Sequence, residues 1–218
     1  MQNKKTEMNG KDDIDLISEK YRKYLIKIKI SDSSYYFIHG ADITDDYKDK
    51  LLIDSNKKIL LFGKLEDLFN YIEQSNYLFD VDNFKKWIKS LREFFGNKYP
   101  EHLEYCIYDM NLIRLLFIDF KSNDIFNYGK VYLEEYASFI NLVDDYSNQM
   151  KNKALSDLLE ELNIRLLWDY FYDFHIWKTS EEKKMEFQNK INTEWSEESF
   201  RKNFSKIYNT FISSTLVY

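Results

Sequence analysis

Residues 51–73, LLIDSNKKILLFGKLEDLFNYIE, combine two strand-like runs and one helix-like run in a short stretch of chain. The apolar runs at 51–53 and 58–62 flank a segment of turn-forming residues, 54–57, and so predict a β-hairpin. Directly afterwards the apolar residues follow spacings of three and four, which predict an amphipathic helix: Leu65, Leu68, Phe69 and Ile72. This switch from hairpin to helix predicts an α+β fold.

The chain before this stretch also predicts strands. Residues 24–30, YLIKIKI, alternate apolar and basic residues with period two, and residues 35–39, YYFIH, follow the turn-forming segment 31–34. Together with the hairpin they predict a four-stranded antiparallel sheet at the N-terminal end of the fold. Residues 1–18 lack a strong apolar pattern, and we expect them to form a disordered leader.

The chain after this stretch predicts helices. A second apolar stripe runs through residues 84–95 and stops at Gly96 and Pro100, two residue types that end helices. We therefore expect an α+β sub-domain at 19–98, with a four-stranded antiparallel sheet and two helices, and a larger helical sub-domain at 101–218. One continuous domain is the alternative.

Catalytic motifs are scarce. The chain has three His, one Cys and five Gly. The spacing of these residues provides no zinc-binding His pair, no phosphate-binding glycine loop and no nucleophile motif. We therefore expect a protein that is not an enzyme and uses no cofactor and no metal. The single Cys106 fits a reducing compartment, and no apolar run approaches the roughly 20 residues of a membrane span, so we expect a cytoplasmic protein.

One catalytic alternative remains open. Residues 115–121, LLFIDFK, form an apolar run that ends in Asp119-x-Lys121, with Asp109 ten residues earlier. Some metal-dependent nucleases use paired acids and a lysine in such a strand context to hold a divalent ion and orient water. The same acid-x-Lys spacing occurs elsewhere in the chain, for example at 46–48, so the spacing by itself does not specify a catalytic site.

Negative charge is concentrated in one segment. Residues 122–177 hold ten acidic and four basic residues, which gives this segment the whole formal charge of −6 that the chain carries. Such a field repels nucleic-acid phosphates and attracts a basic partner. We therefore expect a protein partner and neither nucleic acid nor a membrane.

Aromatic residues accompany this charge. Residues 167–177, LWDYFYDFHIW, place two Trp, two Tyr and two Asp close together, and Asp169 and Asp173 share a helix face. Trp and Tyr are enriched at binding hot spots, and carboxylates pair with Arg or Lys of a basic partner. A solvated face of a core helix is the alternative interpretation. The residues that we expect to contact the partner are Asp144, Asp145, Glu160, Glu161, Trp168, Asp169, Tyr170 and Asp173.

The first 95 residues resemble a known class of proteins. The stretch 51–73 followed by residues 79–91, FDVDNFKKWIKSL, is similar to the small immunity proteins of bacterial polymorphic and contact-dependent toxin systems. This resemblance implies a non-enzymatic protein that inhibits a cognate toxin, often a basic nuclease, by covering its active site with an acidic surface. A scaffold or adaptor that binds without inhibiting remains the second alternative, beside the nuclease.

Overall fold

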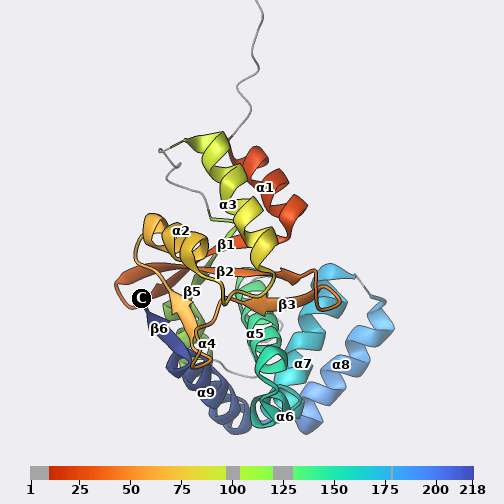
Figure 1. The fold of residues 1–218 in the computed structure, drawn as a ribbon. Helices are drawn as coiled ribbons and strands as arrows, with labels where there is room; N and C mark the ends of the chain where they lie inside the picture. Colours follow the sequence, from red (N-terminus) through yellow and green to blue (C-terminus); the bar gives the residue numbers. More distant parts are fainter. Residues whose placement is uncertain (1–9, 97–103, 120–129, 178) are drawn as a thin grey trace, which may run out of the picture. The chain divides into compact units, whose positions relative to one another are not determined.

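The chain forms two compact units in a computed structural model that describes residues 10–96, 104–119, 130–177 and 179–218 (Figure 1). The first unit consists of residues 1–107 together with 216–218, and the second consists of residues 108–215. The division therefore lies after Ile107, later than the junction expected at 96–100, and the chain returns to the first unit at its C-terminal end.

The main sheet is mixed and has the order β3-β2-β1-β5. Its strands are β1 (Lys23–Ile30), β2 (Ser33–Asp42), β3 (Lys48–Leu51) and β5 (Cys106–Asp109). β1 and β2 form the expected antiparallel hairpin, with Ile30 opposite Ser33. The sequence also predicted an α+β fold with an N-terminal sheet, which is confirmed.

The prediction that residues 58–62 form the fourth strand of the main sheet was wrong. Residues 58–62 contribute β4 (Ile59–Leu61), which pairs with β6 (Thr215–Val217) in a separate two-stranded sheet. Phe62, directly after β4, is bridged to Tyr36 of β2 by two backbone hydrogen bonds of 2.8 Å. The edge of β1 is instead occupied by β5, where the Tyr105 amide donates to the Leu25 carbonyl at 2.7 Å. A long-range pairing of this kind leaves no local sequence signal, so hairpin patterns miss it.

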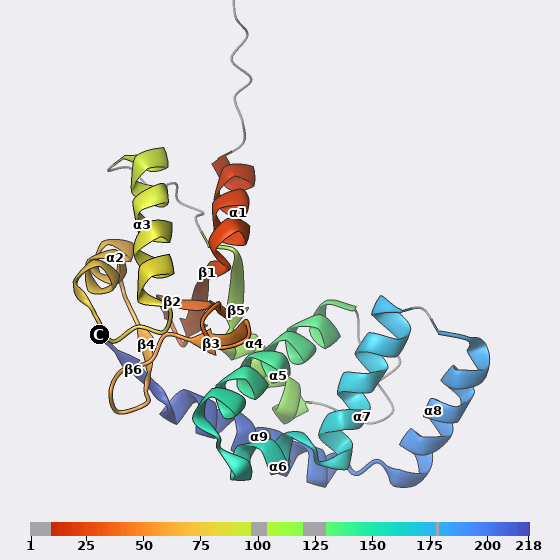
Figure 2. The same cartoon turned by 45° about the vertical axis from the view of Figure 1, so that its right-hand side comes forward.

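The described residues of the first unit form the helices α1 (Gly10–Tyr21), α2 (Leu65–Gln74) and α3 (Val81–Phe95). α2 and α3 are the two predicted helices, and α3 ends at Gly96, whose φ of 63° suits glycine. α1 contradicts the disordered leader over residues 10–18, because Ile14 is buried in the core with Trp87 and Leu91. Residues 1–9 lie outside the described residues. α1 and α3 lie side by side in both views (Figures 1 and 2).

A buried ion pair lies within this unit. The Lys23 side chain is fully buried, and its Nζ donates to Oδ2 of Asp80 at 2.9 Å and to the Ala41 carbonyl at 2.6 Å. The phenyl rings of Phe79 and Phe84 lie 5.2 and 5.1 Å from the same Nζ. Asp80 precedes α3 in a left-handed conformation, with φ of 56°. The pair therefore ties β1 to the start of α3.

Helices make up the second unit (Figure 2). Its elements are α4 (Met110–Asp119), α5 (Lys130–Met150), α6 (Lys153–Leu159), α7 (Leu162–Phe171), the π-helical segment η2 (Tyr172–Ile176), α8 (Glu181–Glu194) and α9 (Glu197–Ser213). Fully buried aromatic residues of α5 and α9 form much of its core: Phe139, Phe200, Phe204 and Phe211.

A break separates two helices of the second unit. α6 ends at Leu159 with Glu160 as its C-cap, and α7 starts at Leu162 after its N-cap Glu161. Glu161 has φ and ψ of −59° and 137°, outside the helical region, so the chain changes direction there. Both glutamates are exposed at this break.

Candidate protein-binding surface

The acidic residues selected from the sequence lie on three parts of the second unit. Asp144 and Asp145 lie in the last turns of α5, and Glu160 and Glu161 form the break between α6 and α7. Asp169 lies on α7 and Asp173 lies in η2. Asp144, Glu160 and Glu161 are exposed, whereas the other three are half-buried.

Arg165 on α7 is the cation among these acids. Its Nε lies 3.9 Å from Oε2 of Glu160, and its Nη2 lies 3.7 Å from Oδ1 of Asp169. The centre of its guanidinium group lies 4.4 Å from the centroid of the Trp168 ring, a cation–π distance. Both ion-pair distances are longer than a direct charged hydrogen bond of about 2.8 Å, so the carboxylates keep capacity for another donor.

Trp168 is held in position by polar and aromatic contacts. Its Nε1 donates to Oδ1 of Asn141 at 2.8 Å, and Nδ2 of Asn141 donates to the Tyr172 hydroxyl at 2.7 Å. The rings of Trp168 and Tyr172 lie 4.2 Å apart. Trp168 is half-buried, so this network fixes the indole and leaves part of it exposed to a partner. We call Asp144, Glu160, Arg165, Trp168 and Asp169 the acidic-aromatic surface.

The surroundings of Asp144 and Asp169 disfavour the charged form of both carboxylates. Partial desolvation raises the pKa of Asp144 although the residue is exposed, and the negative charges of Asp145 and Glu160 add to that rise. Burial also raises the pKa of Asp169, which Arg165 opposes and Asp173 reinforces. Crowded carboxylates around one cation cost folding energy, and such a cost is common at binding sites.

Two of the selected residues face elsewhere. Tyr170 is 9% exposed, and its ring stacks on Phe187 of α8 at 5.0 Å, so it stabilises the packing of α7 and α8. Asp173 lines a small hollow of about 180 Å³ between η2 and α8, beside Lys183 and Lys190. Neither side chain belongs to the acidic-aromatic surface.

Sequence reasoning missed three members of this network: Asn141, Arg165 and Tyr172. The spacing of Arg165, Trp168 and Asp169, three and four residues apart on a helix, was available as a signal for two of these contacts. The Asn141 contact was not, because Asn141 and Trp168 are 27 residues apart in the chain.

The nuclease residues do not have the predicted surroundings. Residues 110–119 form helix α4 rather than a strand, so the strand context predicted for Asp119 is wrong. Oδ1 of Asp109 accepts hydrogen bonds from the Asn111 and Leu112 amides at 3.0 and 3.2 Å, which is a helix-capping role. Lys121 lies outside the described residues.

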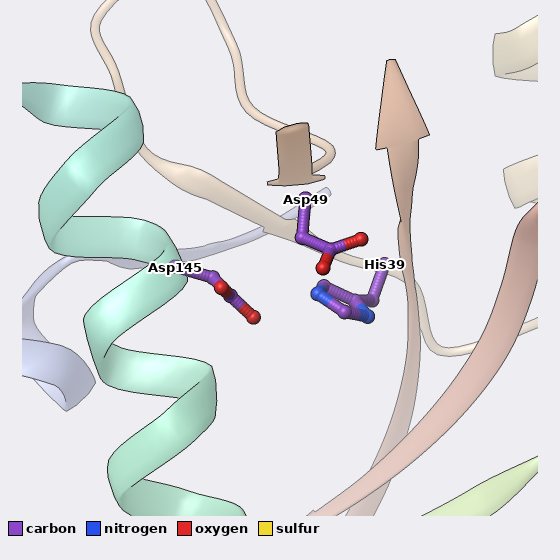
Figure 3. Close-up of side chains that lie close together, drawn as sticks. All are labelled: His39, Asp49 and Asp145. Carbon is purple, nitrogen blue, oxygen red and sulfur yellow. The ribbon is translucent and has the colours of Figure 1, made fainter. Parts of the chain in front are cut away.

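A histidine and a carboxylate approach each other on the main sheet. Figure 3 shows His39 of β2 and Asp49 of β3 pointing toward one another, with a ring nitrogen and a carboxylate oxygen within 4.8 Å. Asp145, also labelled there, belongs to α5 of the second unit. Zinc sites use three or four protein ligands, so the two side chains of the first unit do not make one.

Comparisons with known proteins bear on the fold. No family model matches the chain, and no curated protein matches it. Among solved structures, the chain is similar to the C-terminal domain of SatS, determined in complex with bromine, with a TM-score of 0.56 and 13% sequence identity. The match covers 92% of this chain and 96% of that one. Within the described parts of the chain, no helix is both long and apolar enough to cross a bilayer. The similarity shows a shared α+β fold.

Proposed function

We propose that this protein binds a basic protein partner through the acidic-aromatic surface of its second unit. The observation that carries this proposal is that Glu160 and Asp169 both lie within 4 Å of Arg165, while Asp144 interacts electrostatically with Glu160 and Arg165. A basic side chain of the partner would supply the positive charge that these carboxylates lack. The ring of Trp168 beside them offers apolar contact area, as at binding hot spots.

We further propose that the partner is a toxin and that the protein is its non-enzymatic cytoplasmic inhibitor. This step rests on the resemblance of residues 51–91 to toxin-immunity proteins and on the acidic charge of residues 122–177. Coverage of a basic active site by carboxylates would block the entry of a negatively charged substrate such as nucleic acid.

Growth rescue tests this proposal. The gene next to the one for this protein is expressed in bacteria with or without the full-length chain, and survival is measured. We expect rescue by the wild type and loss of rescue by the triple variant Asp144→Asn, Glu160→Gln, Asp169→Asn. Asp157→Asn is the matched control, because Asp157 is an exposed acid of α6 that pairs with Lys153 at 3.1 Å.

The alternatives predict other outcomes. A scaffold protein would bind the neighbouring product without rescuing growth. Cleavage of DNA or RNA by the purified protein in Mg²⁺ or Mn²⁺, abolished by Asp119→Ala, would replace the binding proposal with the nuclease. Rescue that survives the triple variant would remove the acidic-aromatic surface from the interaction.

A further inference from the structure

A groove on the first unit has a lining suited to an organic cation. It has a volume of about 550 Å³ and runs along α2. The residues that line it include Asp67 and Tyr71 of that helix, Tyr77 beyond the end of the helix, and Tyr218. Figures 1 and 2 both show the C-terminal end of the chain beside α2. All of these residues belong to the first unit.

Two tyrosine rings form a corner in this groove. The rings of Tyr71 and Tyr218 lie 5.1 Å apart at an angle of 69°. The fully buried ring of Phe62 lies behind them, 5.5 Å from Tyr71 and 5.1 Å from Tyr218. The Tyr218 amide donates to the Leu61 carbonyl at 2.8 Å, which holds the backbone of this residue in place. The corner is therefore fixed by packing before any ligand arrives.

The corner remains open to solvent. Tyr218 is 65% exposed although its ring has two aromatic neighbours, and Tyr77 at the rim is 94% exposed. Aromatic faces carry negative electrostatic potential and attract cations, most strongly when more than one ring contacts the cation. Exposed and pre-positioned rings are typical of sites that bind quaternary ammonium groups.

The charge of the groove lining also favours a cationic ligand. Asp67 is an exposed acid, and no basic side chain lines the groove among the residues that the structure describes. Burial raises the pKa of Tyr71; a hydrogen bond with Ser75 opposes this rise, and the neighbouring Tyr218 and Asp54 add to it. This environment repels phosphate and favours a positively charged ligand.

We propose that this groove binds a quaternary or methylated ammonium group, seated against Tyr71 and Tyr218 with its charge toward Asp67. The ammonium group belongs either to a small molecule such as choline or to a methylated lysine of a peptide. This site is on the first unit and is independent of the acidic-aromatic surface of the second.

NMR titration of the full-length protein tests the proposal with three probes: choline, its neutral isostere 3,3-dimethylbutan-1-ol, and a short peptide that carries trimethyllysine. We expect saturable shifts of the tyrosine ring signals with choline and with the peptide, and much weaker binding of the neutral alcohol. A higher affinity for the peptide than for choline identifies a protein side chain as the source of the ammonium group, and the reverse identifies a small molecule.

Substitutions separate the charge from the rings. Asp67→Asn should weaken choline binding by about two- to fivefold, the range of an exposed ion pair. Tyr218→Leu, which keeps an apolar contact with Phe62, should weaken it by about two- to fivefold through loss of the aromatic face. Asp82→Asn is the matched control, since Asp82 is also an exposed acid in the first turn of a helix of this unit.

The proposal is overturned by any of three results. The first is the absence of saturable shifts with both cationic probes. The second is equal binding of choline and its neutral isostere, which would make the groove a merely apolar depression. The third is an equal effect of Asp67→Asn and Asp82→Asn, which would show a general charge effect.

Discussion

Lys23 illustrates how one residue can hold an element in place. Burial lowers the pKa of Lys23, and the neighbouring carboxylate of Asp80 opposes that effect. We predict that Lys23→Met destabilises the protein by about 3–5 kcal/mol, because it leaves the buried Asp80 without its cation. The free energy of unfolding in urea measures this loss.

The double variant Lys23→Met, Asp80→Asn provides the control. Asn tolerates the left-handed backbone at position 80, and the buried site then holds no charge. We expect most of the lost stability to return. A single variant as stable as the wild type would show that the ion pair contributes nothing to folding.

Asp144 gives a prediction about pH. Its pKa is raised above the ordinary 3.8, so the folded state binds its proton more tightly than the unfolded state does. Stability therefore falls as pH rises through the interval above 3.8, and the loss is complete at neutral pH. Asp144→Asn should raise the melting temperature at pH 7 by roughly 2 °C, the effect of a fraction of a kcal/mol.

This gain should shrink as the pH falls toward the ordinary aspartate value. Circular dichroism melts at pH 7 and pH 4, with Asp157→Asn as the control that loses an ion pair with Lys153, provide the measurement. A gain that stays the same at both pH values would assign the effect to something other than ionisation of Asp144.

At the scale of elements, α5 and α7 should contribute differently to partner binding. Exposed Asp144 on α5 acts through long-range attraction, so Asp144→Asn should mainly slow association, and the rate should fall steeply as salt shortens the Debye length below about 8 Å. Half-buried Asp169 on α7 lies next to Arg165 and Trp168. Asp169→Asn should therefore mainly speed dissociation, and it should weaken the binding free energy by about 2–5 kcal/mol if the contact is desolvated in the complex. Surface plasmon resonance over a salt series separates the two rates.

The elements that the sequence predicted correctly are those with strong local periodicity. The β1–β2 hairpin, α2 and α3 follow from alternation, helical spacing and Gly96. α1 was missed because its apolar residues are sparse, with Ile14, Ile17 and Tyr21 facing the core among charged neighbours. The exchange of β4 for β5 was unpredictable, since the contact of Tyr105 with Leu25 depends on the whole path of the chain. The site followed the same rule: its charges were visible in the sequence, but the Asn141–Trp168 contact was not.

At the scale of the whole molecule, the two units should differ in their independence. The second unit is continuous from Tyr108 to Thr215 and contains its own aromatic core around Phe139 and Phe204. We predict that residues 108–215 expressed alone keep their helical circular dichroism signal and unfold cooperatively. Phe204→Ala should lower the stability of this fragment by about 3–5 kcal/mol. A fragment without a cooperative transition would contradict this division of the chain.

The return of the chain to the first unit has a consequence for protein synthesis. A ribosome makes residues 1–107 first, but Leu216, Val217 and Tyr218 follow only after the entire second unit has been translated. Until then β4 lacks its partner strand, and the rings of Phe62 and Tyr71 lack the contact with Tyr218. The second unit is contiguous in the chain, whereas the first unit, although translated earlier, is completed only by residues made after the second unit.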